Sequence, residues 1–172
     1  MTGSPPALIE PLADDIARIT PASAHIGEGV NHWFHATLAN RAIQLQHEWN
    51  PERKGSGPLL WRPFQLGFVL LAAASVCDDG DVDRGVMDLL WFPTGGGKTE
   101  AYLALIAMLA FHRRLSSDEP DSHAGVAAVM RYTLRLLTTQ QFVRASALIL
   151  ACEAIRRSAA RSSGWSQRLG SR

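Results

Sequence analysis

The chain has 172 residues, of which 47% are hydrophobic and 19% are charged, so it is long and apolar enough for one packed domain and is not globally disordered. Its two cysteines, Cys77 and Cys152, lie far apart and in no paired motif, which argues against a disulfide framework and against a zinc site. The chain has no recognisable signal peptide and no apolar run of about 20 residues, so we expect a cytoplasmic protein without a membrane span.

The formal net charge of +1 hides an uneven distribution. Residues 1–112 carry seven basic and twelve acidic side chains, whereas residues 113–172 carry ten basic and four acidic ones. A basic C-terminal third suits a polyanionic partner such as nucleic acid. Charge alone, however, favours a solvated, arginine-rich helix face over such a partner.

The N-terminal segment, residues 1–58, is expected to be helical and irregular. A short helix is predicted over residues 7–19, and an amphipathic helix over residues 30–49 is indicated by apolar residues at near-helical spacing. His32 and His35 lie one helical turn apart, as metal ligands can. No third ligand accompanies them, so surface or core positions are favoured for both.

A further helix is predicted over residues 63–76, because proline suits the first turn of a helix. An acidic, turn-rich stretch follows it. Asp79, Asp81 and Asp83 alternate as in a calcium-binding loop, but the glycine and the glutamate that such a loop requires are missing. We therefore interpret this stretch as a solvated loop.

The remaining chain alternates between predicted strands and helices. Residues 88–92 and 126–132 are short, mostly apolar runs, and helices are predicted over residues 98–114 and 138–157. Strand, loop, helix, strand, helix is the order of a parallel sheet with flanking helices. The expected fold class is therefore α/β, preceded by the helical N-terminal segment.

A glycine-rich loop joins the first predicted strand to its helix. Its sequence is Pro93-Thr94-Gly95-Gly96-Gly97-Lys98-Thr99. Glycines let backbone N–H groups approach phosphate oxygens, and a helix N-terminus favours the same negative charge. Lys98 would reach the β- and γ-phosphates of ATP, and the Thr99 hydroxyl would hold Mg²⁺, which makes these two the predicted catalytic residues. The predicted cofactors are ATP and Mg²⁺, bound by Thr94, Gly95, Gly96, Gly97, Lys98 and Thr99.

The strict phosphate-loop pattern has glycine six positions before the lysine, where this chain has Phe92. The form Pro-Thr-Gly-x-Gly-Lys-Thr instead resembles motif I of superfamily 2 helicases and translocases. Arg62-Pro63-Phe64-Gln65 resembles the Q motif of that superfamily. The resemblance implies that Arg62 and Gln65 contact the nucleotide, with the glutamine amide reading the adenine edge. The alternative is a helix-start proline followed by a surface glutamine.

Residues 133–140 resemble helicase motif Ia, commonly Pro-Thr-Arg-x-Leu-x-x-Gln, although the leading Pro-Thr is Thr-Leu here. The resemblance implies that Thr133, Arg135 and Gln140 contact the backbone of single-stranded DNA. An arginine and helix N-terminal amides bind phosphates without reading sequence. The alternative is a first helical turn packed by leucines.

The run from residue 61 to residue 157 is similar to the large helicases of the DISARM phage-defence system. The resemblance implies an incomplete RecA-like ATP-binding domain over residues 59–160. Residues 161–172 are rich in serine, arginine and glycine and have no apolar periodicity, so we expect a disordered tail there. Phosphoryl transfer also requires an acidic Asp-Glu-x-x motif and an arginine finger. No such motif follows Gln140, and Asp118-Glu119 lies too early in the chain.

We therefore interpret the chain as the N-terminal fragment of an ATP-dependent DNA helicase or translocase, inactive alone. Its expected partners are single-stranded DNA and the remaining helicase domains or a second polypeptide. Two alternatives remain at this point. One is a nonenzymatic nucleotide- or DNA-binding accessory fragment, and the other is a kinase or other NTPase unrelated to helicases.

Overall fold

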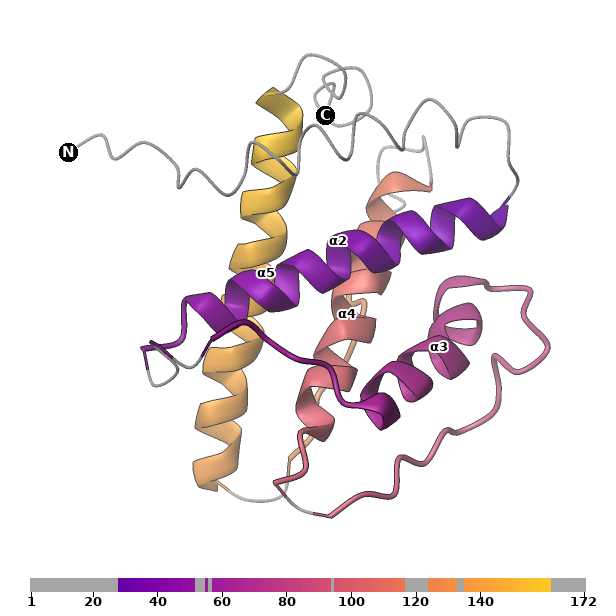
Figure 1. Ribbon diagram of the computed structural model, residues 1–172. Coiled ribbons are helices and arrows are strands. Elements are labelled where there is room, and N and C mark those ends of the chain that lie inside the picture. Colours follow the sequence, from indigo (N-terminus) through magenta and orange to yellow (C-terminus); the bar gives the residue numbers. More distant parts are fainter. Residues whose placement is uncertain are drawn as a thin grey trace.

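The computed structural model describes residues 28–51, 55, 57–93, 95–116, 124–132 and 135–161. These residues form four helices, namely α2 (Glu28–Glu48), α3 (Pro63–Cys77), α4 (Lys98–Leu115) and α5 (Arg135–Arg161), which are shown in Figure 1. Side chains are described from residue 34 in α2 and over residues 139–159 in α5. The helix predicted over residues 7–19 lies outside the described residues.

The helices predicted over residues 30–49, 63–76, 98–114 and 138–157 are confirmed, with ends displaced by a few residues. In α5, the buried positions Leu148, Ala151, Cys152, Ile155 and Ala159 recur three or four residues apart and form one apolar stripe. α4 is buried over a wider arc, because its buried residues are packed against three other helices. α5 continues to Arg161, the first residue of the expected tail, and residues 162–172 lie outside the described part of the chain.

The core lies around α4, which contacts each of the other three helices. α2 crosses α4 and α5, while α3 packs along a different side of α4 (Figure 1). Leu38 of α2, Leu103 and Met108 of α4 and Leu148 of α5 are fully buried at the centre. His35 is also buried, and its ring meets the ring of His112 edge-on at a centroid distance of 5.2 Å.

Both cysteine side chains belong to this core as free thiols. Burial raises the pKa of Cys77 to about 11 and the pKa of Cys152 to about 12. Both groups therefore remain protonated at neutral pH, where they pack as small apolar side chains.

The expected α/β fold is wrong for the part of the chain that the structure describes, because this part is all-helical and contains no strand and no sheet. Residues 88–92 and 126–132, the two predicted strands, are neither helical nor paired. Leu89 and Trp91 are 83% and 88% exposed, and Val129 is 84% exposed. A strand requires a neighbouring backbone to accept and donate its hydrogen bonds, and neither run has one among the described residues.

Residues 78–85, the acidic stretch after α3, form turns that cap the end of this helix. The Arg84 guanidinium donates to the backbone carbonyls of Ser75 and Val76, at 2.7 Å each, and pairs with Asp79 at 2.8 Å. A cation at the C-terminal end of a helix satisfies carbonyls that have no intrahelical partner and opposes the helix dipole.

No described helix is both long enough and apolar enough to cross a membrane.

Candidate nucleotide site

The glycine loop folds as a tight turn that leads directly into α4. Gly95 has a φ of 78° and Gly97 a φ of 91°, values that residues with a β-carbon rarely adopt. The N–H of Gly96 donates to the carbonyl of Pro93 at 3.1 Å and closes the turn. Gly97 is the N-cap of α4, so the free N–H groups of the first helical turn face this loop. Thr94 lies outside the described residues.

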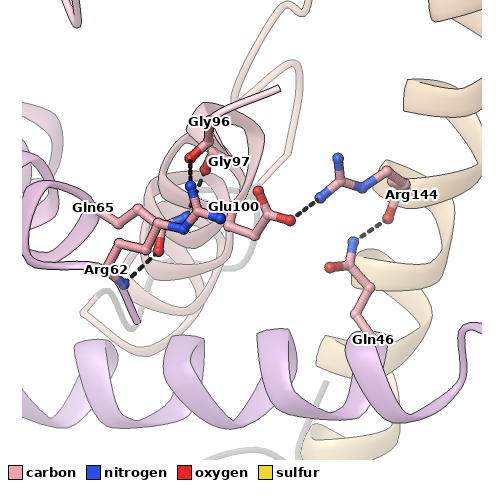
Figure 2. A network of polar contacts seen from close by, with 7 residues as sticks. All are labelled: Gln46, Arg62, Gln65, Gly96, Gly97, Glu100 and Arg144. Carbon is pink, nitrogen blue, oxygen red and sulfur yellow. Dashed lines mark hydrogen bonds and ion pairs between the residues drawn. The ribbon is translucent and has the colours of Figure 1, made fainter. Parts of the chain in front are cut away.

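Two side chains from the start of α3 hold the loop in place (Figure 2). Arg62 Nη1 donates to the carbonyl of Gly96 at 2.8 Å, and Gln65 Nε2 donates to the carbonyl of Gly97 at 2.6 Å. Gln65 Oε1 in turn accepts the backbone N–H of Arg62 at 2.8 Å. The structure therefore brings Arg62 and Gln65 to the loop, where they brace its backbone. Contact between these residues and adenine stays a prediction.

Gln65 is not the surface residue of the alternative interpretation, because it is only 4% exposed. A buried amide requires partners for both its oxygen and its nitrogen, and Gln65 finds them on two different backbone segments. The local sequence explains this arrangement, since Pro63 begins α3 and places Gln65 in the first helical turn.

Phe92, at the position where the strict pattern has glycine, anchors the loop to α3. Its ring stacks on the ring of Phe64, with centroids 3.8 Å apart and planes 13° apart. A β-carbon on Gly96 would lie 2.5 Å from the Phe92 ring and 2.9 Å from the Pro93 carbonyl oxygen. A side chain at position 96 would collide with the stacked Phe92 ring, so this packing of Phe92 requires Gly96.

The predicted phosphate-binding lysine points back over the loop. Lys98 Nζ donates to the backbone carbonyls of Phe92 and Pro93, the latter at 3.1 Å. Thr99 is the next residue of α4 and is partly exposed. Loop glycines with positive φ, a helix N-terminus and an ammonium group at the same turn are features of phosphate sites. In this structure the Gly96 N–H and the ammonium group donate to carbonyls of the loop itself.

Sequence reasoning missed an ion pair beside this loop. Glu100, in the first turn of α4, pairs through Oε1 with Arg144 Nη2 of α5 at 2.7 Å (Figure 2). Gln46 of α2 donates from Nε2 to the backbone carbonyl of Arg144 at 2.5 Å. The sequence contains no signal for these contacts, because the residues lie on three separate helices and share no motif.

The predicted nucleic-acid contacts lie at the start of α5. Arg135 is the first residue of this helix, and Gln140 is exposed in its second turn. Thr133 lies outside the described residues, and the side chain of Arg135 is not described. The Glu100–Arg144 pair, about one turn beyond Gln140, connects α5 to the first turn of α4.

The chain is similar to the DISARM protein DrmA of Bacillus paralicheniformis. The two sequences are 53% identical over 117 residues, which make up 66% of this chain and 10% of that protein. This chain is therefore related to a DISARM protein and matches about a tenth of its length. No family model matches the chain, and no solved structure matches it.

Proposed function

We propose that this chain, a relative of a DISARM protein, is the Mg-ATP-binding part of a larger phage-defence helicase or translocase. The observation that carries the proposal is the glycine loop at the N-terminus of α4, braced by Arg62 and Gln65 of α3. Lys98 would hold the β- and γ-phosphates, and Thr99 would coordinate Mg²⁺. The N–H groups of the loop would surround the phosphate oxygens.

The base of the nucleotide would lie on the α3 side of the loop. Arg62 and Gln65 flank the loop there, and the Gln65 amide carries both a donor and an acceptor for the adenine edge. Both groups of the amide contact the backbone in the present structure. Adenine recognition would therefore require at least one of these hydrogen bonds to be shared or exchanged.

Single-stranded DNA would bind at the start of α5 through Thr133, Arg135 and Gln140. Support for this part of the proposal comes from Arg135 opening the helix and from the exposure of Gln140. Such contacts would be made to phosphates and would carry no base specificity. Their strength should fall with added salt.

A Mg-ATP binding measurement tests the nucleotide part of the proposal. We expect calorimetry to detect binding by the wild-type chain and Lys98→Ala to weaken it by roughly tenfold or more, because a charge-assisted contact to phosphate is lost. Lys54→Ala, which removes the other lysine of the chain, is the matched control and should bind as wild type. The proposal fails if the wild-type chain does not bind Mg-ATP or if Lys98→Ala binds equally well.

The chain alone should not turn over ATP, because hydrolysis in the helicase family also needs the acidic motif and the arginine finger. Remaining helicase domains or a second polypeptide would supply these groups. DNA-stimulated ATP turnover by this chain that disappears in Lys98→Ala would refute this expectation. Nucleotide binding without turnover also fits a nonenzymatic accessory fragment, and only a gain of activity on adding the missing part separates the two.

Binding of a labelled single-stranded oligonucleotide tests the contact at α5. Arg135→Ala should weaken it and reduce its salt dependence, since one phosphate contact is lost. Arg157→Ala, near the other end of the same helix, is the control for the loss of one positive charge. Equal effects of the two substitutions would indicate a general charge effect and no site at the start of α5.

A further inference from the structure

The Glu100–Arg144 pair is largely withdrawn from solvent, with side chains that are 12% and 29% exposed. Charges in such a position interact more strongly than charges on an open surface, because water screens them less. Removing either partner takes a close opposite charge away from the other. This pair therefore contributes to the electrostatic potential around the first turn of α4, together with Lys98 and Arg62.

The Glu100 carboxylate lies against the last glycine of the loop. Its Oε2 atom is 3.5 Å from the position that a β-carbon on Gly97 would occupy. A negative charge in the first turn of a helix is favourable on its own, because it opposes the helix dipole. The same charge would repel the triphosphate that the loop is proposed to bind.

Arg144 is held where it cancels this charge. The Gln46 side chain of α2 donates to its backbone carbonyl, and Gln46 is itself only 8% exposed. The guanidinium then reaches from α5 to α4 and meets the carboxylate at 2.7 Å (Figure 2). Three helices thus position one positive charge beside the loop.

We propose that Arg144 is a positioning residue of the nucleotide site, which neutralises Glu100 and so allows the glycine loop to accept a triphosphate. The inference rests on the proposed function, because it assumes that the loop binds Mg-ATP. The inference assigns α5 to the nucleotide site, whereas the sequence motifs predict only a nucleic-acid contact for this helix.

The two single substitutions should act in opposite directions. Arg144→Gln removes the positive charge that pairs with the Glu100 carboxylate and should weaken Mg-ATP binding by about tenfold. Glu100→Gln removes the repulsion and should bind at least as tightly as wild type. The double variant Glu100→Gln/Arg144→Gln should recover to within about threefold of wild type, and Arg144→Lys should bind nearly as well as wild type.

The test is a set of Mg-ATP affinities for these four variants and the wild type, with thermal unfolding measured alongside. Arg157→Gln, which also removes an ion-paired arginine from α5, is the control and should not change the affinity. The inference is overturned if Arg144→Gln binds like wild type. It is also overturned if the double variant binds as weakly as Arg144→Gln, since a purely structural role gives that result.

A failure of the proposed function would give a different result in the same binding measurements. A wild-type chain that does not bind Mg-ATP refutes the proposed function, and the inference with it, before any variant is compared. A wild-type chain that binds Mg-ATP while both single substitutions weaken binding refutes the inference alone.

Discussion

Two features of Gly97, its backbone conformation and its contact with Gln65, disfavour a side chain at this position, and one substitution tests both. Its φ of 91° disfavours any residue with a β-carbon, and that β-carbon would lie 2.8 Å from Gln65 Nε2. The same Nε2 atom donates to the Gly97 carbonyl, so a side chain here would push away its own hydrogen-bond donor. Backbone strain and a lost buried hydrogen bond would then add together.

Gly97→Ala should therefore lower the free energy of unfolding by roughly 1–3 kcal/mol, as measured by urea denaturation. Gly67→Ala is the matched control, because Gly67 lies within α3 and a β-carbon there would meet no atom within 4 Å. Alanine in a helix interior should be neutral or stabilising by up to about 1 kcal/mol. Similar destabilisation by both substitutions would contradict the role assigned to Gly97.

The sequence predicts the residues of the glycine loop, but it does not predict the ion pair that lies beside the loop. Arg62 and Gln65 are predicted to contact the nucleotide, because they resemble a Q motif, and this contact stays a prediction. The structure places both side chains against the backbone of the loop. Glu100 and Arg144 were not predicted as a pair. They are separated by 44 residues, and no spacing rule applies across two different helices.

At the scale of elements, the helices could be predicted and the strands could not. The apolar stripe of α5 has a period that only a helix satisfies, so its existence follows from local sequence. The run Asp88–Phe92 indicates only that its apolar side chains would favour burial. Whether such a run becomes a strand depends on a neighbouring backbone, which its own residues do not encode.

The C-terminal half of α5 should show a pH-dependent stability. Hydrogen bonds from Arg156, and secondarily from Arg157, lower the pKa of Glu153 from 4.5 to about 2. A carboxyl group whose pKa is lower in the folded state stabilises the fold above pH 4.5, and this contribution disappears as the pH falls towards 2. The side chain of Glu153 is 36% exposed, so solvent screening limits the effect to about 1 kcal/mol or less.

Urea denaturation of wild type and Glu153→Gln at pH 7 and pH 2 measures this contribution. The wild type should be the more stable protein at pH 7, and the difference should shrink at pH 2. A difference that is equal at the two pH values would show that Glu153 does not act through its charge.

At the scale of the whole molecule, the exposed apolar residues stand out. α3 is almost entirely apolar, and its residues Leu66, Leu70 and Leu71 are 45%, 59% and 73% exposed. Among the described residues α3 packs mainly against α4, and it lies at the edge of the molecule in Figure 1. Apolar patches of this kind promote association. We therefore expect the isolated chain to self-associate.

Leu70→Lys/Leu71→Lys should reduce this self-association while leaving the melting temperature nearly unchanged, because both side chains already face solvent. Sedimentation velocity over a range of protein concentrations measures the effect. Thr139→Lys, on an exposed polar position of α5, separates the added charge from the removed apolar surface. Equal relief by the control would assign the effect to net charge.

The contact between Lys98 and the carbonyls of Phe92 and Pro93 changes how nucleotide affinity should be understood. The ammonium group already has oxygen acceptors, so phosphate binding is a competition in which one set of acceptors replaces another. The measured affinity then reports only the difference between the two sets. Part of the attraction between the Lys98 ammonium group and a phosphate is therefore offset by the two carbonyl contacts that the lysine would give up.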